Sequence, residues 1–146
     1  RSPYDGDPEA LIMLCGDGGS GDVEECRALI ARGIDIDLQG QYQRTALILA
    51  ASNGRTEVVQ ELVRAGAALD LQDKDGWTAL MRAAFGGRAE IAQELVRAGA
   101  ALDLQDKKGK TARIIAEYEP TLPRIVDTLA RAEQRELERK YVKRGK

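Results

Sequence analysis

The feature that most constrains the fold of this chain is an internal repeat with a period of 33 residues. Residues 60–74 read QELVRAGAALDLQDK, and residues 93–107 repeat this stretch without a change. The same spacing separates Gly33, Gly66 and Gly99. Because repeats of this length are the signature of stacked supersecondary units, the chain is predicted to fold as an array rather than around one central core.

Each unit reads as a short helix, a glycine turn, a second helix and an extended loop. In the third unit, Thr78 stands where a helix N-cap hydroxyl is wanted, and Gly86-Gly87 ends the first helix. Residues 89–98 form a second helix with its apolar residues on one face, and Gly99 stops it. Since one such unit cannot bury its apolar face alone, neighbouring units must stack into a solenoid.

The third unit resembles the ankyrin repeat. It reads DKDGWTAL over residues 73–80, followed by Ala83-Ala84 and Gly87. The resemblance covers residues 8–130 and implies an all-α fold, an ankyrin-type helix-turn-helix solenoid with extended fingertip loops. We expect a single domain over residues 1–146, with repeats at approximately 8–40, 41–73, 74–106 and 107–130 and a C-terminal capping helix and basic tail at 123–146.

The sequence also departs from the ankyrin pattern. The family's Thr-Pro-Leu-His is Thr-Ala-Leu-Ile from Thr45 onward, and the other units also lack the proline, which presets φ, and the histidine. Gly40 and Gln43 replace the usual turn Asp and Gly, so an irregular second finger is expected. In the last unit, residues 119–123 carry two prolines, and Pro123 is expected to open the capping helix.

The composition excludes several kinds of chemistry. The 146 residues contain no histidine, which excludes Ser-His-Asp and Cys-His catalysis and histidine metal sites. The net charge of −2 argues against a dedicated nucleic-acid binder, and no apolar run is long enough to span a membrane. Cys15 and Cys26 are interpreted as reduced, partly buried thiols, with a disulfide or a redox pair as the alternative. We therefore expect no enzyme activity, no metal and no cofactor.

A glycine-rich segment, residues 16–21, supplies an alternative function. It matches G-x-G-x-x-G, follows the apolar run 10–15 and precedes a predicted helix over residues 23–32. After a strand, such a segment binds the phosphates of a dinucleotide, and the chain would then be a nucleotide-binding domain. We favour the repeat interpretation, in which the run 10–15 is the first short helix, because the helix at 23–32 keeps the 33-residue register.

The resemblance to ankyrin repeats implies a non-enzymatic protein-protein interaction module or scaffold, since that family binds proteins through fingertip loops and the inner faces of the short helices. Stacked repeats would align equivalent residues of these elements in rows on one concave surface. Several of them are Trp, Tyr and Arg, the types enriched at interface hot spots, with packing inside the repeats as the alternative role. The candidate partner-binding residues are Tyr42, Arg44, Leu49, Trp77, Arg82, Phe85, Lys110, Ile115 and Tyr118.

The charges indicate what kind of partner would bind. Arg82, at an inner helix position, suits an acidic or mixed acidic-apolar segment of a protein or peptide partner. Residues 1–32 carry a net charge of −4 and residues 99–146 a net charge of +4. The basic run 139–146 is interpreted as the solvated end of a helix, with an acidic partner, an anionic membrane surface or an import receptor as alternatives. We expect a monomeric, intracellular protein, cytoplasmic or nuclear, with no nucleic-acid partner.

Overall fold

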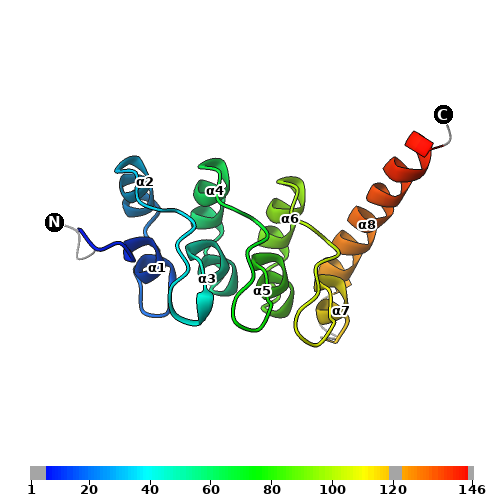
Figure 1. Ribbon diagram of the computed structural model, residues 1–146, viewed down its shortest axis with the longest axis horizontal. Helices are drawn as coiled ribbons and strands as arrows, with labels where there is room; N and C mark the ends of the chain where they lie inside the picture. Colours follow the sequence, from blue (N-terminus) through cyan, green and yellow to red (C-terminus); the bar gives the residue numbers. More distant parts are fainter. Residues whose placement is uncertain (1–5, 119–122, 145–146) are drawn as a thin grey trace.

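The structure, a computed structural model, describes residues 6–118 and 123–144. Within these ranges the chain is all-helical and contains no strand, and its helices form pairs that stand side by side in chain order (Figure 1). This arrangement is the helix-turn-helix solenoid that the sequence predicts. Most of the proline-containing turn expected at 119–123 lies outside the described residues.

The helices form two rows. The inner row consists of α1 (Ala10–Cys15), α3 (Ala46–Ser52), α5 (Ala79–Phe85) and α7 (Ala112–Glu117). The outer row consists of α2 (Val23–Ala31), α4 (Thr56–Arg64), α6 (Ala89–Arg97) and the longer α8 (Pro123–Arg144). Loops project beside the inner row, and we call them the second finger (39–44), the third finger (72–77) and the fourth finger (105–110) (Figure 1).

Three of the inner helices begin at the threonines that the sequence predicts as N-caps. The hydroxyls of Thr45, Thr78 and Thr111 accept hydrogen bonds from the backbone N–H three residues on, at 3.1, 3.2 and 3.4 Å. A cap of this kind contributes about 1 kcal/mol to helix stability. The cap therefore fixes where each finger ends and the next inner helix starts.

The core is a continuous band between the two rows and is built mainly from small aliphatic residues. Ala50, Ala51, Ala83 and Ala84 have no exposed surface, because they lie where adjacent inner helices pack together. Alanine at these positions lets the helix backbones approach closely. The scarcity of aromatic residues thus follows from the packing distance between repeats, and the few aromatics are available for other roles.

A row of glutamines links the fingers. The side-chain amide of Gln39 donates to the backbone carbonyls of Gln43, at 3.0 Å, and Gln72, at 3.2 Å. Gln72 repeats this arrangement one unit later, with Gly76 at 2.8 Å and Gln105 at 3.0 Å. Each glutamine therefore closes its own finger and also ties it to the next finger.

The second finger is irregular, as the sequence predicts. It contains a short 3-10 turn, Gln41–Gln43, in which Tyr42 and Gln43 have φ values of +58° and +60°. At the register of Gln43 the later fingers carry Gly76 and Gly109, with φ values of +79° and +78°. All three fingers thus have a positive φ at this register, but the second finger has a second one at Tyr42 and places both on residues that favour negative φ.

The glycine-rich segment 16–21 is a structural turn between α1 and α2. The run before it is a helix, so the strand required by a dinucleotide fingerprint is missing, and the nucleotide-binding alternative loses its structural basis. A Cβ at Gly19 would collide with the backbone carbonyl of Met13, and Arg55 donates to the carbonyl of Gly19 at 2.8 Å. Close packing within and between repeats therefore explains glycine at this position.

The two cysteines are free, buried thiols with no exposed surface. Burial raises the pKa of the Cys15 thiol to about 12, the nearby Cys26 adds to this effect, and Arg55 opposes it. Burial likewise raises the pKa of Cys26 to about 11, with a further contribution from Glu61 and an opposing one from Arg27. Both thiols are accordingly protonated at neutral pH.

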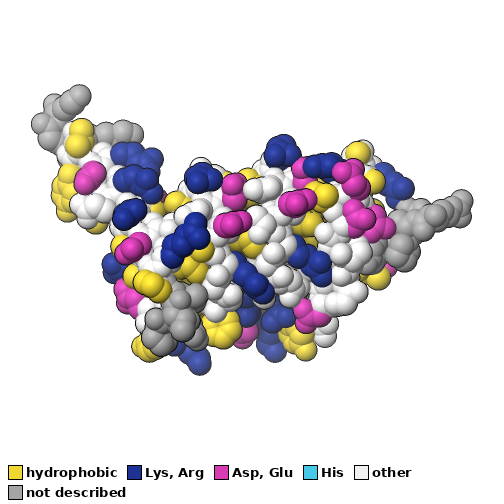
Figure 2. Space-filling view, turned by 180° about the vertical axis from the view of Figure 1, so that it is seen from behind, with side chains coloured by type: hydrophobic (Ala, Val, Ile, Leu, Met, Phe, Trp, Pro, Cys, Tyr) yellow, Lys and Arg dark blue, Asp and Glu magenta, His cyan; other side chains and the backbone are white. Residues whose placement is uncertain are grey.

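The last helix, α8, begins where predicted and covers the end of the stack. Ile125, Leu129 and Ala132 are buried against the preceding repeat. Beyond them the helix stands clear of the body (Figures 1 and 2), and Leu137 and Tyr141 are 47% and 68% exposed. None of the described helices is long and apolar enough to cross a membrane.

Candidate partner-binding surface

The fingers and the exposed sides of α3, α5 and α7 together form what we call the inner surface. Six of the nine predicted residues lie on it as pairs, in which a cationic group stands over an aromatic ring. Such cation–π pairs hold the charged group close to the ring. The pairs are Arg44 with Tyr42 (5.3 Å to the ring centroid), Arg82 with Trp77 (4.4 Å) and Lys110 with Tyr118 (4.7 Å).

The structure brings Trp77, Arg82 and Phe85 together. The rings of Trp77 and Phe85 meet edge to face, with centroids 5.4 Å apart and an interplanar angle of 73°. The indole of Trp77 is half-buried between this contact and the Arg82 guanidinium, whereas Phe85 is 56% exposed. The predicted cluster therefore has a packed part, Trp77 with Arg82, and an exposed part, Phe85.

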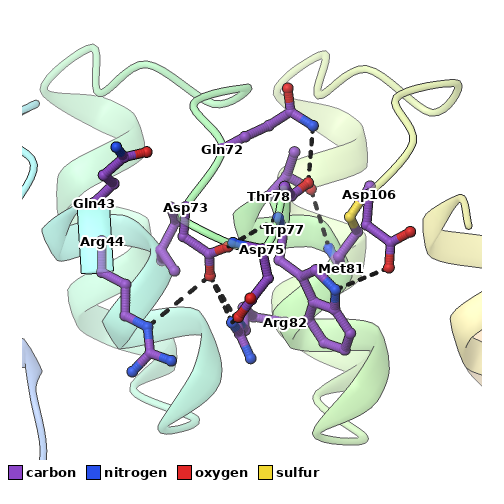
Figure 3. A network of polar contacts seen from close by, with 12 residues as sticks. Gln43, Arg44, Gln72, Asp73, Asp75, Trp77, Thr78, Met81, Arg82 and Asp106 are labelled. Atoms are coloured by element: carbon purple, nitrogen blue, oxygen red, sulfur yellow. Dashed lines mark hydrogen bonds and ion pairs between the residues drawn. The ribbon is translucent and has the colours of Figure 1, made fainter. Parts of the chain in front are cut away.

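The carboxylate of Asp73 organises the third finger (Figure 3). Its Oδ1 accepts the backbone N–H of Asp75 at 2.9 Å and that of Trp77 at 3.0 Å. Its Oδ2 accepts Nη2 of Arg82 at 2.6 Å and Nε at 3.2 Å, and Nε of Arg44 lies 4.0 Å away. From the sequence, Arg82 was expected to meet an acidic partner segment, but in the structure Asp73 already supplies an acidic group for it.

The carboxylate of Asp106 plays the matching part in the fourth finger. Its Oδ1 accepts the backbone N–H groups of Lys108 and Lys110, both at 2.9 Å, and its Oδ2 accepts Nε1 of Trp77 at 3.0 Å. Burial would raise the pKa of Asp106, but these hydrogen bonds and the charge of Lys110 outweigh burial and hold the pKa below its ordinary value. The charged form is thus the one that the finger stabilises.

Two predicted site residues point into the protein. Ile115 is 5% exposed and belongs to the core, where it offers a partner almost no surface. Leu49 is half-buried and packs against the core. Ile115 occupies the register of Arg82, whose side chain is 16% exposed and ion-paired with Asp73, so the surroundings of this register position depend on the side chain.

A hollow of about 360 Å³ opens between the third and fourth fingers. Trp77, Arg82, Asp75 and Asp106 line one part of it. The remainder is lined by Lys107, Lys108 and Lys110, of which the first two were not predicted as site residues. We call this feature the fingertip hollow.

Asp73 and Asp106, which organise the third and fourth fingers, were not among the site residues predicted from the sequence. A signal was present, because both occupy the same place in the identical 15-residue segments and stand four residues before Trp77 and Lys110. Aspartate at the start of a turn often accepts backbone N–H groups further along it. In the described part of the chain, no group of three or more acidic or cysteine side chains is arranged to hold a metal ion.

Comparison with known families agrees with this architecture. A family model described as "Ankyrin repeats (3 copies)" matches residues 11–106 and, again, residues 57–138. The two matches span most of the chain, so it belongs to the ankyrin-repeat family. A comparison with curated proteins returned no match. Ankyrin repeats are generally protein-protein interaction modules, bind protein partners and typically have no enzymatic activity.

Proposed function

We propose that this chain binds a segment of another protein on its inner surface. The exposed aromatic rings carry this proposal. Phe85 is 56% exposed at the end of α5, with Tyr42 and Tyr118 exposed on the neighbouring units at 51% and 70%. Large apolar side chains gathered in solvent on an ordered surface are typical of interaction sites.

The charge of the inner surface supports an acidic or mixed acidic-apolar partner. Lys74, Lys107 and Lys108 are exposed on the fingers. The carboxylates of Asp73 and Asp106 are buried and engaged in the hydrogen bonds of their own fingers. The accessible charge of the fingers is therefore predominantly positive, which favours approach by a negatively charged segment.

The residues of the cluster have different roles in this proposal. Phe85 is the anchor, because its ring is exposed and, among the described residues, makes one ring contact, with Trp77. Trp77 and Arg82 shape the surface, since Asp106 and Asp73 hold them in place. Replacing Trp77 therefore perturbs both stability and the surface, whereas replacing Phe85 tests the surface alone.

The test is partner capture with Phe85→Ala. The variant should lose at least about nine-tenths of the captured partner, because truncating a central aromatic anchor costs about 2 kcal/mol or more of binding energy. Capture is measured by quantitative mass spectrometry of proteins retained from lysate. Circular dichroism should show an unchanged helical signal and melting temperature.

Leu137→Ala is the matched control, because Leu137 is a large exposed apolar residue outside the inner surface. It should leave capture unchanged. Equal capture by the wild type and Phe85→Ala would remove Phe85 as an anchor. If Leu137→Ala loses capture and Phe85→Ala does not, the partner binds on α8 rather than on the inner surface.

A further inference from the structure

The fingertip hollow has a chemistry more specific than that of the rest of the inner surface. It is bounded on one side by the third finger and on the other by the fourth finger, and its volume of about 360 Å³ suits a side chain rather than a folded domain. What it binds depends on the proposed function, since the ligand group would belong to the partner segment.

Only some of the cationic side chains that line the hollow form ion pairs with carboxylates of the protein. Arg82 is paired with Asp73 at 2.6 Å and lies 3.8 Å from Asp75. The ammonium groups of Lys107 and Lys108 have no ion-pair partner among the described residues. The hollow therefore presents two solvated lysines that a ligand anion could approach.

The negative groups of the hollow are fixed in place. Both carboxylate oxygens of Asp106 accept hydrogen bonds, from the backbone N–H groups of Lys108 and Lys110 and from the indole N–H of Trp77. Asp75 is largely exposed and shares Arg82 with the buried Asp73. Neither carboxylate is thus paired with Lys107 or Lys108, although both add negative potential to the hollow.

An apolar site adjoins the hollow. The Trp77 ring lines the hollow and also meets the exposed ring of Phe85 at 5.4 Å. The Trp77 ring therefore borders both the cationic hollow and the apolar site at Phe85. An extended segment advances about 3.3 Å per residue, so two or three residues cover about 7–10 Å, which exceeds the 5.4 Å between the Trp77 and Phe85 ring centroids.

We propose that the fingertip hollow binds a carboxylate side chain of the partner segment, through Lys107 and Lys108, while an apolar side chain two or three residues away packs on Phe85. We commit to a carboxylate because it is the anion that an unmodified acidic segment carries. The lysines attract a doubly charged phosphate more strongly than a carboxylate, and Asp75 and Asp106 also repel it more strongly, so a comparison of the two anions decides between them.

The experiment uses three labelled hexapeptides with the full 146-residue chain at about 50 mM salt, where charge effects are strong. The peptides are Leu-Glu-Glu-Leu-Glu-Glu, its Gln analogue, and an analogue with phosphoserine for glutamate. Affinity is measured by fluorescence anisotropy, and the site by amide chemical shifts. The glutamate peptide should bind about tenfold or more tightly than the glutamine peptide. Its largest shifts should fall on residues 106–110 and the Trp77 indole N–H.

Lys107→Glu with Lys108→Glu should weaken the glutamate peptide by about tenfold or more. Arg139→Glu with Lys140→Glu changes the net charge equally at exposed sites on α8 and should leave the affinity within about twofold. Equal weakening by both pairs, absence of binding by the glutamate peptide, or shifts centred on α8 would overturn the proposal. Tighter binding of the phosphoserine peptide would replace carboxylate with phosphate as the ligand.

These outcomes are separable from failure of the proposed function. If Phe85→Ala abolishes partner capture but the lysine reversal leaves it intact, the chain is an interaction module and the hollow is not its anion site. If Phe85→Ala leaves capture intact, the proposed function fails at its anchor, whatever the peptides do.

Discussion

Two aspartates in identical sequence have different partners. Asp73 and Asp106 both close their fingers through Oδ1, but Oδ2 binds Arg82 in one case and Trp77 in the other. The difference arises because the register of Arg82 is filled by Ile115 in the last unit, so Asp106 lacks a guanidinium and takes the indole of the preceding unit instead. Trp77 consequently links the third finger to the fourth.

Trp77→Phe tests this link. It keeps an aromatic ring but removes the N–H that Asp106 accepts, and a buried carboxylate that loses a donor destabilises the fold by about 1–2 kcal/mol. Urea denaturation followed by circular dichroism measures the change at pH 7. Phe85→Leu, at an exposed ring, is the control and should change stability by less than about 0.5 kcal/mol.

The same variant makes a prediction about pH. The folded pKa of Asp106 lies below its ordinary value of 3.8, so the stability from this carboxylate is present above pH 3.8 and is lost as the pH falls through the folded value. The stability difference between wild type and Trp77→Phe should therefore shrink on acidification below about pH 4. A difference that stays constant or grows in acid would show that the hydrogen bond is not its source.

Interactions between residues close together in the chain can be predicted from the sequence. The threonine caps are predictable because donor and acceptor lie three residues apart on one turn. The pairing of Asp73 with Arg82 spans nine residues and depends on how the third finger folds back over α5. An arginine at the inner helix position of Arg82 could therefore be recognised from the sequence as a candidate site residue, but its pairing with Asp73 could not be predicted.

Among the elements, the inner helices depend most on their surroundings. They contain six or seven residues, well below the length at which a helix is stable alone. Contacts with neighbouring repeats stabilise these short helices, and threonine caps add to the stability of α3, α5 and α7. The last helix, α8, is different because its 22 residues include a stretch without tertiary support.

Two changes in α8 separate its capping part from its projecting part. Leu129→Ala should cost about 2–5 kcal/mol, because it removes a fully buried side chain at the end of the stack. Removing residues 134–146 should change the free energy of unfolding by less than about 1 kcal/mol, since the cut spares the ion pair between Glu133 and Arg113. Thermal and urea denaturation measure both, and a large effect of the truncation would mean that the projecting part packs on the body.

The positions of the helices were largely predictable, because the residues that begin and end a helix recur at the same place in successive repeats. The glycine-rich segment was harder, since a helix of six residues and a buried strand share the same short apolar pattern in sequence. Register with later repeats, rather than local pattern, identified α1. The surface role of Ile115 was mispredicted because register does not decide whether an apolar side chain turns inward.

At the scale of the whole molecule, the main contacts between the described helix pairs join each pair to its neighbours in the stack, so stability is distributed along the stack. Among the described residues, the first pair packs against a neighbouring pair on one side, and it contains both thiols. Opening of this pair should cost less than unfolding of the whole chain. The chemical reactivity of the two thiols therefore measures how readily the first helix pair opens.

Alkylation by iodoacetamide at pH 8 measures this opening. Cys15, with a pKa of about 12, should be about a thousandfold less ionised than a thiol at the ordinary value of 9.0. Both thiols should become reactive at a lower urea concentration than the midpoint of the circular dichroism transition. Coincidence of the two transitions would mean that the end repeat unfolds only with the rest.

Because the segments at 60–74 and 93–107 are identical, one whole repeat can be removed without creating a new sequence at the junction. A deletion of 33 residues that begins anywhere within the first segment and ends at the matching place in the second leaves a junction with the original sequence. Unequal crossing-over between the two coding stretches would make such a deletion, or the reciprocal insertion, without shifting the reading frame. The glutamines and threonine caps of the remaining repeats would be kept, but Thr78, Trp77, Arg82 and Phe85 would be lost. One such event would therefore change both the length of the stack and the chemistry of its inner surface.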